Sequence, residues 1–436
     1  MADSTVQEST SRDTQRWEAL KRPTPDWFRD AKLGVFIHWG PYSVPAWAEP
    51  LGELGTIPPL EWFKHNPYSE WYYNTIRIPG SPAGKHHQEQ WGGRPYDDFL
   101  DMWQAEAFDP AAVAEEIVAA GADYLVLTTK HHDGVCLWDA PGTGDRNTVK
   151  RGPKRDLVQA YADACREQGL RFGTYYSGGL DWHVSPQDPI GLRDDMEITE
   201  RPLDAAYASY AASHIRDLVD RYSPDVVWND IDWPDAGKDF GKDGVGTLFE
   251  EYYASTPEGV VNDRWQVPHF DFATSEYQNS LDNENEDVWE NCRGVGLSFA
   301  YNSVEGRQHA LSGPEAAKHL VDVVSRGGRL LLGVGPQADG TLPKWQSQIL
   351  RDLGEWMKGG AEILKGLRPT KRIAEVSASW VRFGVRDGKL LAFVDSDEPV
   401  TLPGAEVLTP QWASVRDGQL HLDPQRPGPV VVQLPA

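Results

Sequence analysis

The sequence predicts an α/β fold, a distorted (β/α)8-type, TIM-like barrel followed by a small C-terminal antiparallel β-sandwich domain. Two patterns support this prediction. Eight short apolar runs alternate with helical segments, and two hairpin signatures follow near the end of the chain. We expect the 436 residues to divide into a polar N-terminal segment, a catalytic barrel and a β domain, at residues 1–24, 25–365 and 366–436.

The predicted strands are short apolar runs, each bounded by polar residues or glycine. Such runs are typical of strands that are buried on both faces of a parallel sheet. The eight runs are Leu33–His38, Tyr124–Thr129, Phe172–Ser177, Val226–Asn229, Gly259–Asn262, Phe272–Glu276, Gly296–Ala300 and Leu330–Val334.

Helical patterns lie between several of these strands. Asp109 followed by Pro110 is typical of a helix start, with Asp as the N-cap and Pro in the first turn. No helical pattern fits residues 262–272, and none is clear in Tyr277–Arg293, so we expect helices to be missing around strands five and six. The predicted helices are Ala111–Ala120, Asp156–Gln168, Leu203–Arg221, Val245–Ser255, Pro314–Ser325 and Lys344–Met357.

Two further segments complete the predicted architecture. Residues 40–123, between the first two strands, are rich in Trp, Pro and Gly, and we expect them to form an insertion that covers the site. After about Leu367, Asp387-Gly388 and Asp417-Gly418 each separate two strand-like runs. Asp-Gly between such runs is a strong hairpin signal, so the small domain is predicted to be antiparallel.

The composition excludes some classes of partner. Lys and Arg number 42 and Asp and Glu number 66, which gives a net charge of −24. Because proteins that bind phosphate backbones or anionic membranes are usually basic, we expect neither nucleic acid nor a membrane as partner. No apolar run approaches the roughly 18 residues that a membrane-spanning helix needs.

The cysteines and the N-terminus suggest a compartment. Cys136, Cys165 and Cys292 are odd in number and widely spaced, which gives neither a disulfide framework nor a zinc pattern. Reduced thiols are typical of the cytoplasm. Met1–Trp17 is polar and lacks the apolar region of a signal peptide. We therefore expect a cytoplasmic protein, unless a signal peptide has been removed.

Polar side chains collect at six of the eight predicted strand ends, beside tryptophans. In barrels of this class the C-terminal strand ends meet at one mouth, so these residues are expected to share a concave site. Donors, acceptors and flat aromatic faces together suit a polyhydroxylated ligand such as a carbohydrate. The strand ends carry His38, His131 and His132, Tyr175 with Asp181, Asp230, Asp263 with Arg264, and Glu276.

Two of these residues could form the carboxyl pair that a glycosidase needs. Asp230 directly follows a short apolar strand, and Glu276 ends the sixth strand, so the two can face each other across the mouth. The alternative for Asp230 is a helix cap or a turn cap. Glu276 could be a plain surface carboxylate, because three other glutamates are close in sequence, namely Glu284, Glu286 and Glu290.

A metal site is the main rival interpretation of the histidines. His38, His131 and His132 could bind zinc together with Asp133 or Asp230. However, no strand carries a His-x-His pair and no His-Glu-x-x-His helix exists. Adjacent histidines on a strand point to opposite faces unless a bulge at the strand end turns both inward. We expect no metal and no organic cofactor.

Eight segments of the chain resemble the α-L-fucosidases of glycoside hydrolase family 29, and the resemblance runs from about Trp27 to Ile363. It implies a barrel with a C-terminal β domain and the hydrolysis of terminal α-L-fucosyl linkages by a retaining double displacement. The segments are Leu33–Pro41 (LGVFIHWGP), Leu125–Trp138 (LVLTTKHHDGVCLW), Asn147–Leu157, Phe172–Trp182 (FGTYYSGGLDW), Val227–Pro234 (VWNDIDWP), Val261–Trp265, Gly294–Asn302 and Arg326–Gly340 (RGGRLLLGVGPQADG).

The resemblance also implies roles for individual residues. It makes Asp230 the nucleophile and Glu276 the general acid/base. Phe36, Trp228 and Phe299 would form an apolar pocket for the methyl group of fucose. The residues implied to contact sugar hydroxyls are His38, Glu70, Trp71, His131, His132, Tyr175 and Arg264.

The implied partners are fucosylated oligosaccharides or glycoconjugates, and the oligomeric state, a homo-oligomer included, stays open. Two alternatives also stay open at this point. One is a metal-dependent barrel hydrolase, and the other is a non-catalytic fucose-binding protein.

Overall fold

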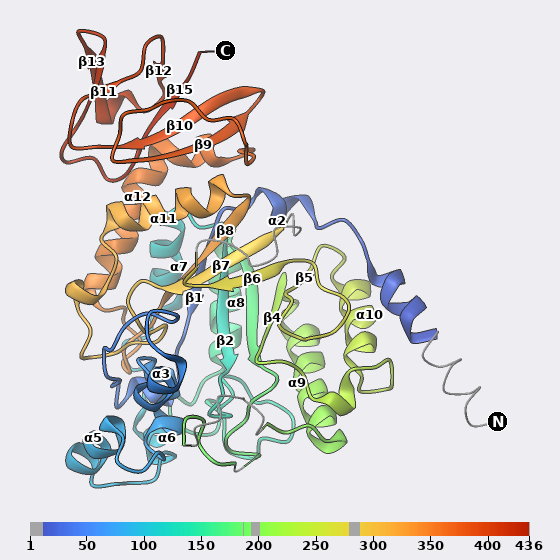
Figure 1. Cartoon of the computed structure of the whole chain (residues 1–436). Coiled ribbons are helices and arrows are strands. Elements are labelled where there is room, and N and C mark those ends of the chain that lie inside the picture. The colour runs from blue at the N-terminus through green and yellow to red at the C-terminus, as the bar shows by residue number, and fades with distance from the viewer. Residues whose placement is uncertain (1–11, 186, 193–200, 279–287, 436) are drawn as a thin grey trace.

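The structure is a computed structural model that describes residues 12–185, 187–192, 201–278 and 288–435 (Figure 1). Its centre is an eight-stranded sheet in the order β5-β4-β3-β2-β1-β8-β7-β6, in which all neighbouring strands are parallel. This confirms the predicted α/β fold. The strands are β1 Leu33–Ile37, β2 Tyr124–Lys130, β3 Arg171–Ser177, β4 Val226–Asp230, β5 Val260–Val261, β6 Ala273–Glu276, β7 Trp289–Gly294 and β8 Gly328–Val334.

The barrel is distorted where it should close. β5 has only two residues, and it is joined to β6 by a single isolated bridge between Asn262 and Phe272. Residues 262–272 are all described and contain no helix, as the sequence predicted. The barrel is therefore weakly closed at this seam, whereas each of the other neighbouring strand pairs forms a ladder of at least two residue pairs.

The prediction for the seventh strand was wrong. It was placed at Gly296–Ala300, but the strand is Trp289–Gly294, and residues 296–300 form bends after it. The strand reads Trp-Glu-Asn-Cys-Arg-Gly, so it offers no apolar run, although every one of its residues is buried. Its polar sequence resembles that of a loop. The strand can nevertheless be buried because hydrogen bonds pair its polar side chains.

Those hydrogen bonds compensate the burial of its polar side chains. Glu290 accepts from the indole Nε1 of Trp228 at 2.8 Å and from the hydroxyl of Tyr124. The side-chain oxygen of Asn291 accepts from Nε2 of His319 at 2.8 Å. A buried polar group is tolerated when it is paired in this way.

In the part of the chain that the structure describes, six helices surround the sheet. The side chain of Asp109 accepts from the N–H groups of Ala111 and Ala112, which confirms the predicted N-cap. The last helix continues past the predicted end at Met357, across Gly359 and Gly360. Glycine disfavours helices, but the burial of the final turn offsets that cost. The helices are α7 Pro110–Ala119, α8 Leu157–Glu167, α9 Ala205–Tyr222, α10 Val245–Ser255, α11 Gly313–Ser325 and α12 Lys344–Leu364.

The insertion between β1 and β2 is helical and lies at the opposite end of the molecule from the C-terminal sheets (Figure 1). Short helices of three to ten residues dominate it, so its path depends on packing between side chains. They are η1 Pro41–Ser43, α3 Pro59–His65, η2 Ser69–Trp71, α4 Tyr72–Thr75, α5 Pro82–Trp91 and α6 Asp98–Met102.

The C-terminal part forms two antiparallel sheets, with strand orders β12-β15-β10-β9 and β11-β14-β13, around one apolar cluster. Both predicted Asp-Gly hairpins are confirmed, as β9–β10 and β13–β14. The bounds of the three segments stay a prediction. The strands are β9 Trp380–Arg386, β10 Lys389–Asp395, β11 Val400–Thr401, β12 Glu406–Val407, β13 Ala413–Arg416, β14 Gln419–Leu422 and β15 Val430–Gln433.

Within the described ranges, no helix combines the length and the apolar character that crossing a bilayer requires. The three cysteines are buried and free.

The buried hydrogen bonds that Glu290 of β7 accepts lead to a prediction about stability. Glu290→Ala leaves the donors of Trp228 and Tyr124 without their acceptor, so we expect the free energy of unfolding to fall by about 2–5 kcal/mol. Glu115→Ala, an exposed position on α7, is the matched control and should change it by less than about 0.5 kcal/mol. Urea denaturation measures both. Equal effects from the two variants would contradict the proposed role of Glu290.

Candidate active site

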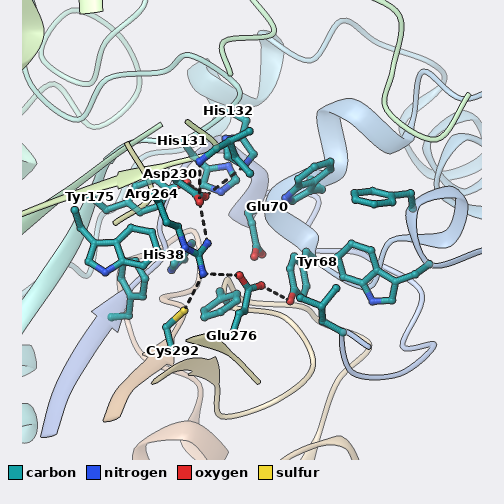
Figure 2. Close-up of a pocket in the computed structure, with 18 residues that line it drawn as sticks. His38, Tyr68, Glu70, His131, His132, Tyr175, Asp230, Arg264, Glu276 and Cys292 are labelled. Carbon is teal, nitrogen blue, oxygen red and sulfur yellow. Dashed lines mark hydrogen bonds and ion pairs between the residues drawn. The ribbon is translucent and has the colours of Figure 1, made fainter. Parts of the chain in front are cut away.

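A cavity of about 140 Å³ opens at the C-terminal ends of the strands (Figure 2). All twelve residues that the resemblance assigns a catalytic or sugar-binding role line it, from both the barrel and the insertion. They are Phe36, His38, Glu70, Trp71, His131, His132, Tyr175, Trp228, Asp230, Arg264, Glu276 and Phe299. Asp181 and Asp263, which were also expected at this mouth, do not line the cavity. The sequence analysis missed six others, Leu54, Trp62, Phe63, Tyr68, Ile231 and Cys292.

Asp230 is the last residue of β4 and is 8% exposed. Its Oδ2 accepts from the hydroxyl of Tyr175 at 2.8 Å, and its Oδ1 accepts from Nη1 of Arg264 at 2.9 Å and from the N–H of Ile231 at 3.0 Å. Burial alone would raise the pKa of Asp230. The charge of Arg264, the nearby His132 and the hydrogen bonds from Arg264 and Tyr175 outweigh burial and lower it below its ordinary value.

Arg264 joins the two predicted carboxyl groups. While Nη1 binds Asp230, Nη2 donates to Oε2 of Glu276 at 3.0 Å (Figure 2). Its Nε donates to the hydroxyl of Thr274 at 3.0 Å, and the guanidinium lies 4.7 Å from the ring centroid of Trp228. The other oxygen of Glu276, Oε1, accepts from the hydroxyl of Tyr68 at 2.8 Å. One planar cation therefore orients both carboxyl groups toward the same cavity.

The backbone is strained directly after both carboxyl residues. Ile231 and Asp232 follow Asp230 with φ values of 59° and 79°, and Tyr277 follows Glu276 with a φ of 57°. A positive φ is a genuine outlier for a β-branched residue such as isoleucine, and such strain concentrates at functional sites. The N–H of Asp232 donates to the carbonyl of Arg264 at 3.0 Å, which ties the strained turn to the guanidinium-bearing loop.

A bulge explains how two adjacent histidines enter one cavity. The register of β2 against β3 shifts between Thr128 and Lys130, just before His131 and His132. The two imidazole rings lie 4.0 Å apart and both line the cavity. The sequence analysis left open that a bulge could turn both inward, and the structure confirms it.

The hydrogen bonds of His132 define its tautomer. Nδ1 lies 2.6 Å from the hydroxyl of Ser177, which itself donates to the carbonyl of Leu180 at 2.7 Å, so Nδ1 must be the donor. Burial lowers the pKa of His132 to about 4, against the opposing charge of Asp230. At neutral pH its Nε2, 3.8 Å from Oδ2 of Asp230, is therefore an unprotonated acceptor.

His38 and His131 are neutral at physiological pH as well. Burial lowers the pKa of His38 to about 3 and that of His131 well below its ordinary value. Nδ1 of each is buried and has no hydrogen-bond partner among the described residues. A neutral imidazole can donate and accept, so these rings are suited to hydroxyl groups.

Glu70, in the insertion, adds a third carboxyl group. It is 1% exposed, and its Oε2 accepts from the hydroxyl of Ser298 at 2.9 Å and from the N–H of Ala300 at 3.0 Å. Burial raises the pKa of Glu70 to about 7, although these hydrogen bonds oppose the rise. Through its hydrogen bonds to Ser298 and Ala300, Glu70 links the insertion to the segment that carries Phe299.

One wall of the cavity is aromatic. The ring of Phe36 lies 5.3 Å from that of Trp228 and 6.1 Å from that of Phe299, and all three are at most 5% exposed. Glu290 fixes Trp228 by accepting a hydrogen bond from its indole N–H. This wall can accommodate an apolar group beside the polar cluster.

A family model described as alpha-L-fucosidase matches residues 1–362. The chain belongs to the alpha-L-fucosidase family.

Known members of this family are similar to this chain along most of their length. The plasma alpha-L-fucosidase of Homo sapiens is 33% identical over 369 residues, which cover 82% of this chain and 72% of that protein. The structure of the Thermotoga maritima alpha-fucosidase in complex with fucose is 40% identical, with a TM-score of 0.81, and covers 96% of this chain and 98% of that one. The same enzyme with a mechanism based inhibitor is 42% identical, with a TM-score of 0.82 and the same coverage. The chain is thus a glycoside hydrolase by family, with the matching barrel and β domain.

Of the glutamates considered beside Glu276, Glu290 does not line the cavity and is bound to Trp228 and Tyr124. Glu284 and Glu286 lie outside the described residues. In the described ranges, no group of three or more His, Cys, Asp or Glu is arranged to hold a metal ion.

The missed residues had weak signals in the sequence. Trp62 and Tyr68 belong to an insertion whose short helices show no usable period, although Tyr68 stands only two residues before Glu70. Cys292 lies on the misplaced seventh strand. Ile231 directly follows Asp230 and could have been included on that ground.

The ion pairs of Arg264 generate a prediction for this family member. Arg264→Met leaves the buried carboxylate of Asp230 without its cation, so we expect the free energy of unfolding at neutral pH to fall by about 3 kcal/mol. Without the cation, burial raises the pKa of Asp230 in the variant. A raised pKa stabilises the folded variant at low pH, and this stabilisation is lost as the pH rises. The difference in unfolding free energy between the unmodified protein and the variant should therefore shrink as the pH falls toward 4.

Urea denaturation between pH 4 and pH 8 measures this effect. Arg351→Met, a half-exposed position on α12, is the control and should show no such pH dependence. A deficit that stays constant over this range would contradict the electrostatic explanation.

Proposed function

We propose that this family member is a retaining exo-glycosidase that hydrolyses terminal α-L-fucosyl linkages, with Asp230 as nucleophile and Glu276 as general acid/base. The observation that carries the proposal is the bridge formed by Arg264, which donates to Asp230 at 2.9 Å and to Glu276 at 3.0 Å. Two carboxyl groups that share one cavity and differ in their partners can take the two roles of a double displacement.

In the first step, the ionised Asp230 attacks the anomeric carbon of the sugar. The bond from this carbon to the leaving oxygen breaks, and Glu276 gives its proton to that oxygen. In the second step, Glu276 takes a proton from water as the water oxygen attacks the anomeric carbon and displaces Asp230. Two inversions restore the α configuration and regenerate both carboxyl groups.

The low pKa of Asp230 supports the first assignment, because a nucleophile must be ionised at the working pH. Tyr175 and Arg264 hold its oxygens, so little reorientation is needed before attack. The complex of the Thermotoga maritima enzyme with a mechanism based inhibitor, at 42% identity, supports covalent chemistry for this chain too.

The remaining cavity residues support fucose as the bound sugar. The neutral histidines, Glu70 and Trp71 offer donors, acceptors and a flat face for hydroxylated carbons. Phe36, Trp228 and Phe299 would surround the methyl group of this 6-deoxy sugar. A sugar with a hydroxyl there would leave it unpaired at a cost of about 1–3 kcal/mol, so discrimination against galactose should be modest.

The natural substrates we propose are fucosylated oligosaccharides or glycoconjugates. The fucose complex of the Thermotoga maritima relative supports this class. Every group in the proposed steps is a side chain or water, and the steps need no metal or organic cofactor.

Azide distinguishes the two roles. On an aryl fucoside whose leaving group needs no proton, Glu276→Ala still forms the fucosyl-enzyme but lacks the base that activates water. Turnover should therefore fall by about 10²–10⁴-fold, and azide should restore it as α-fucosyl azide. In Asp230→Ala no covalent intermediate can form, so turnover should be abolished and azide should attack the substrate directly, giving the β anomer. Proton NMR of the product identifies the anomer.

The control for this experiment is Asp235→Ala, on the loop after β4 but outside the cavity lining, which should hydrolyse at the unchanged rate. Full activity in Asp230→Ala, or the same azide anomer from both variants, would overturn the assignment.

A further inference from the structure

The carboxyl group of Glu276 is held at both of its oxygens. Arg264 donates to Oε2, and the hydroxyl of Tyr68 donates to Oε1 at 2.8 Å, from the opposite side of the carboxyl group (Figure 2). Two donors on different oxygens fix the plane of a carboxyl group, whereas one leaves it free to rotate. Arg264 also serves Asp230, but the only carboxyl group that the Tyr68 hydroxyl contacts among the described hydrogen bonds is that of Glu276.

Tyr68 is itself rigidly placed. It is 5% exposed, its backbone N–H donates to Oδ1 of Asn66 at 2.9 Å, and its carbonyl accepts from the N–H of Trp71 at 3.0 Å. Its ring packs edge-on against Trp62 at 4.8 Å and Phe299 at 5.5 Å. The hydroxyl is therefore a preorganised donor whose position depends on the insertion.

A phenol has a single hydrogen, so its bond to Glu276 depends on the charge of the carboxyl group. When Glu276 is ionised, Tyr68 donates a charge-assisted hydrogen bond to Oε1. When Glu276 is protonated, that bond becomes weaker or must reverse. Burial and the neighbouring Glu276 raise the pKa of Tyr68 well above its ordinary value, so Tyr68 keeps its hydrogen at any working pH. The contact thus favours the ionised carboxylate.

We propose that Tyr68 is a positioning residue for Glu276 that favours the base step of the reaction over the acid step. This inference rests on the proposed role of Glu276. The ionised carboxylate is the form that accepts the proton of water in the second step, and the protonated form is needed only when the leaving group departs. Through Tyr68, the insertion therefore influences whether Glu276, on β6, is ionised or protonated.

Tyr68→Phe removes the hydroxyl and keeps the ring. The lost hydrogen bond stabilises ionised Glu276 by about tenfold relative to the protonated form. The alkaline limb of the pH profile of kcat/KM should therefore move up by about one pH unit in this variant. On an aryl fucoside whose leaving group needs no proton, kcat reports the second step and should fall by about tenfold. Azide needs no base, so it should restore this kcat.

Tyr72→Phe is the matched control, because its hydroxyl pairs with Nδ1 of His87 at 3.0 Å and does not line the cavity. It should change neither the alkaline limb nor the response to azide. Thermal midpoints of both variants near that of the unmodified enzyme would show that both fold.

A double-mutant cycle with Glu276→Gln separates this inference from the proposed function. If Tyr68 acts through Glu276, adding Tyr68→Phe to Glu276→Gln should not lower kcat on the aryl fucoside further. An undiminished effect in that background, or an unmoved alkaline limb in Tyr68→Phe alone, would overturn the positioning role. Full activity of Glu276→Gln would instead overturn the acid/base assignment.

Discussion

The guanidinium group of Arg264 is the constraint on which the rest of the site depends. Two carboxyl groups in a largely buried cavity repel each other and are poorly solvated, so neither holds a defined position without a shared cation. Arg264 supplies that cation with two nitrogens, 2.9 Å from Asp230 and 3.0 Å from Glu276. A lysine could not do this, because its ammonium is a single point of charge without a planar fork.

The weakest seam of the barrel carries this residue. Arg264 follows the two-residue strand β5, which forms no regular ladder with β6 and is linked toward it by the isolated bridge from Asn262 to Phe272. On its other side, β5 is held firmly to β4 by a side chain: Asn262 accepts from the N–H of Asn229 and donates to its carbonyl, both at 2.9 Å. The residue that joins the two carboxyl groups is thus anchored to the strand that ends in Asp230. Irregular closure leaves room for a loop that reaches both carboxyl groups.

Much of this site could be predicted because its polar residues end regular apolar strands, as His38, Tyr175 and Asp230 do. Glu70 and Trp71 could be found only through resemblance, since short helices in the insertion show no usable period. The seventh strand was misplaced because Glu290 and its neighbours are buried through hydrogen bonds, which an apolar pattern cannot reveal. Tyr68 was missed because its function depends on a contact across 208 residues.

Trapping the covalent intermediate tests the central claim most directly. A 2-fluorinated fucosyl fluoride should form the intermediate and hydrolyse it slowly, because the fluorine destabilises the oxocarbenium-like transition state. Peptide mass spectrometry of the inactivated enzyme should then show one fluorofucosyl group on the peptide that contains Asp230, and on Asp230 itself. A label on another residue, or turnover of the reagent to an inverted product with no adduct, would contradict the account.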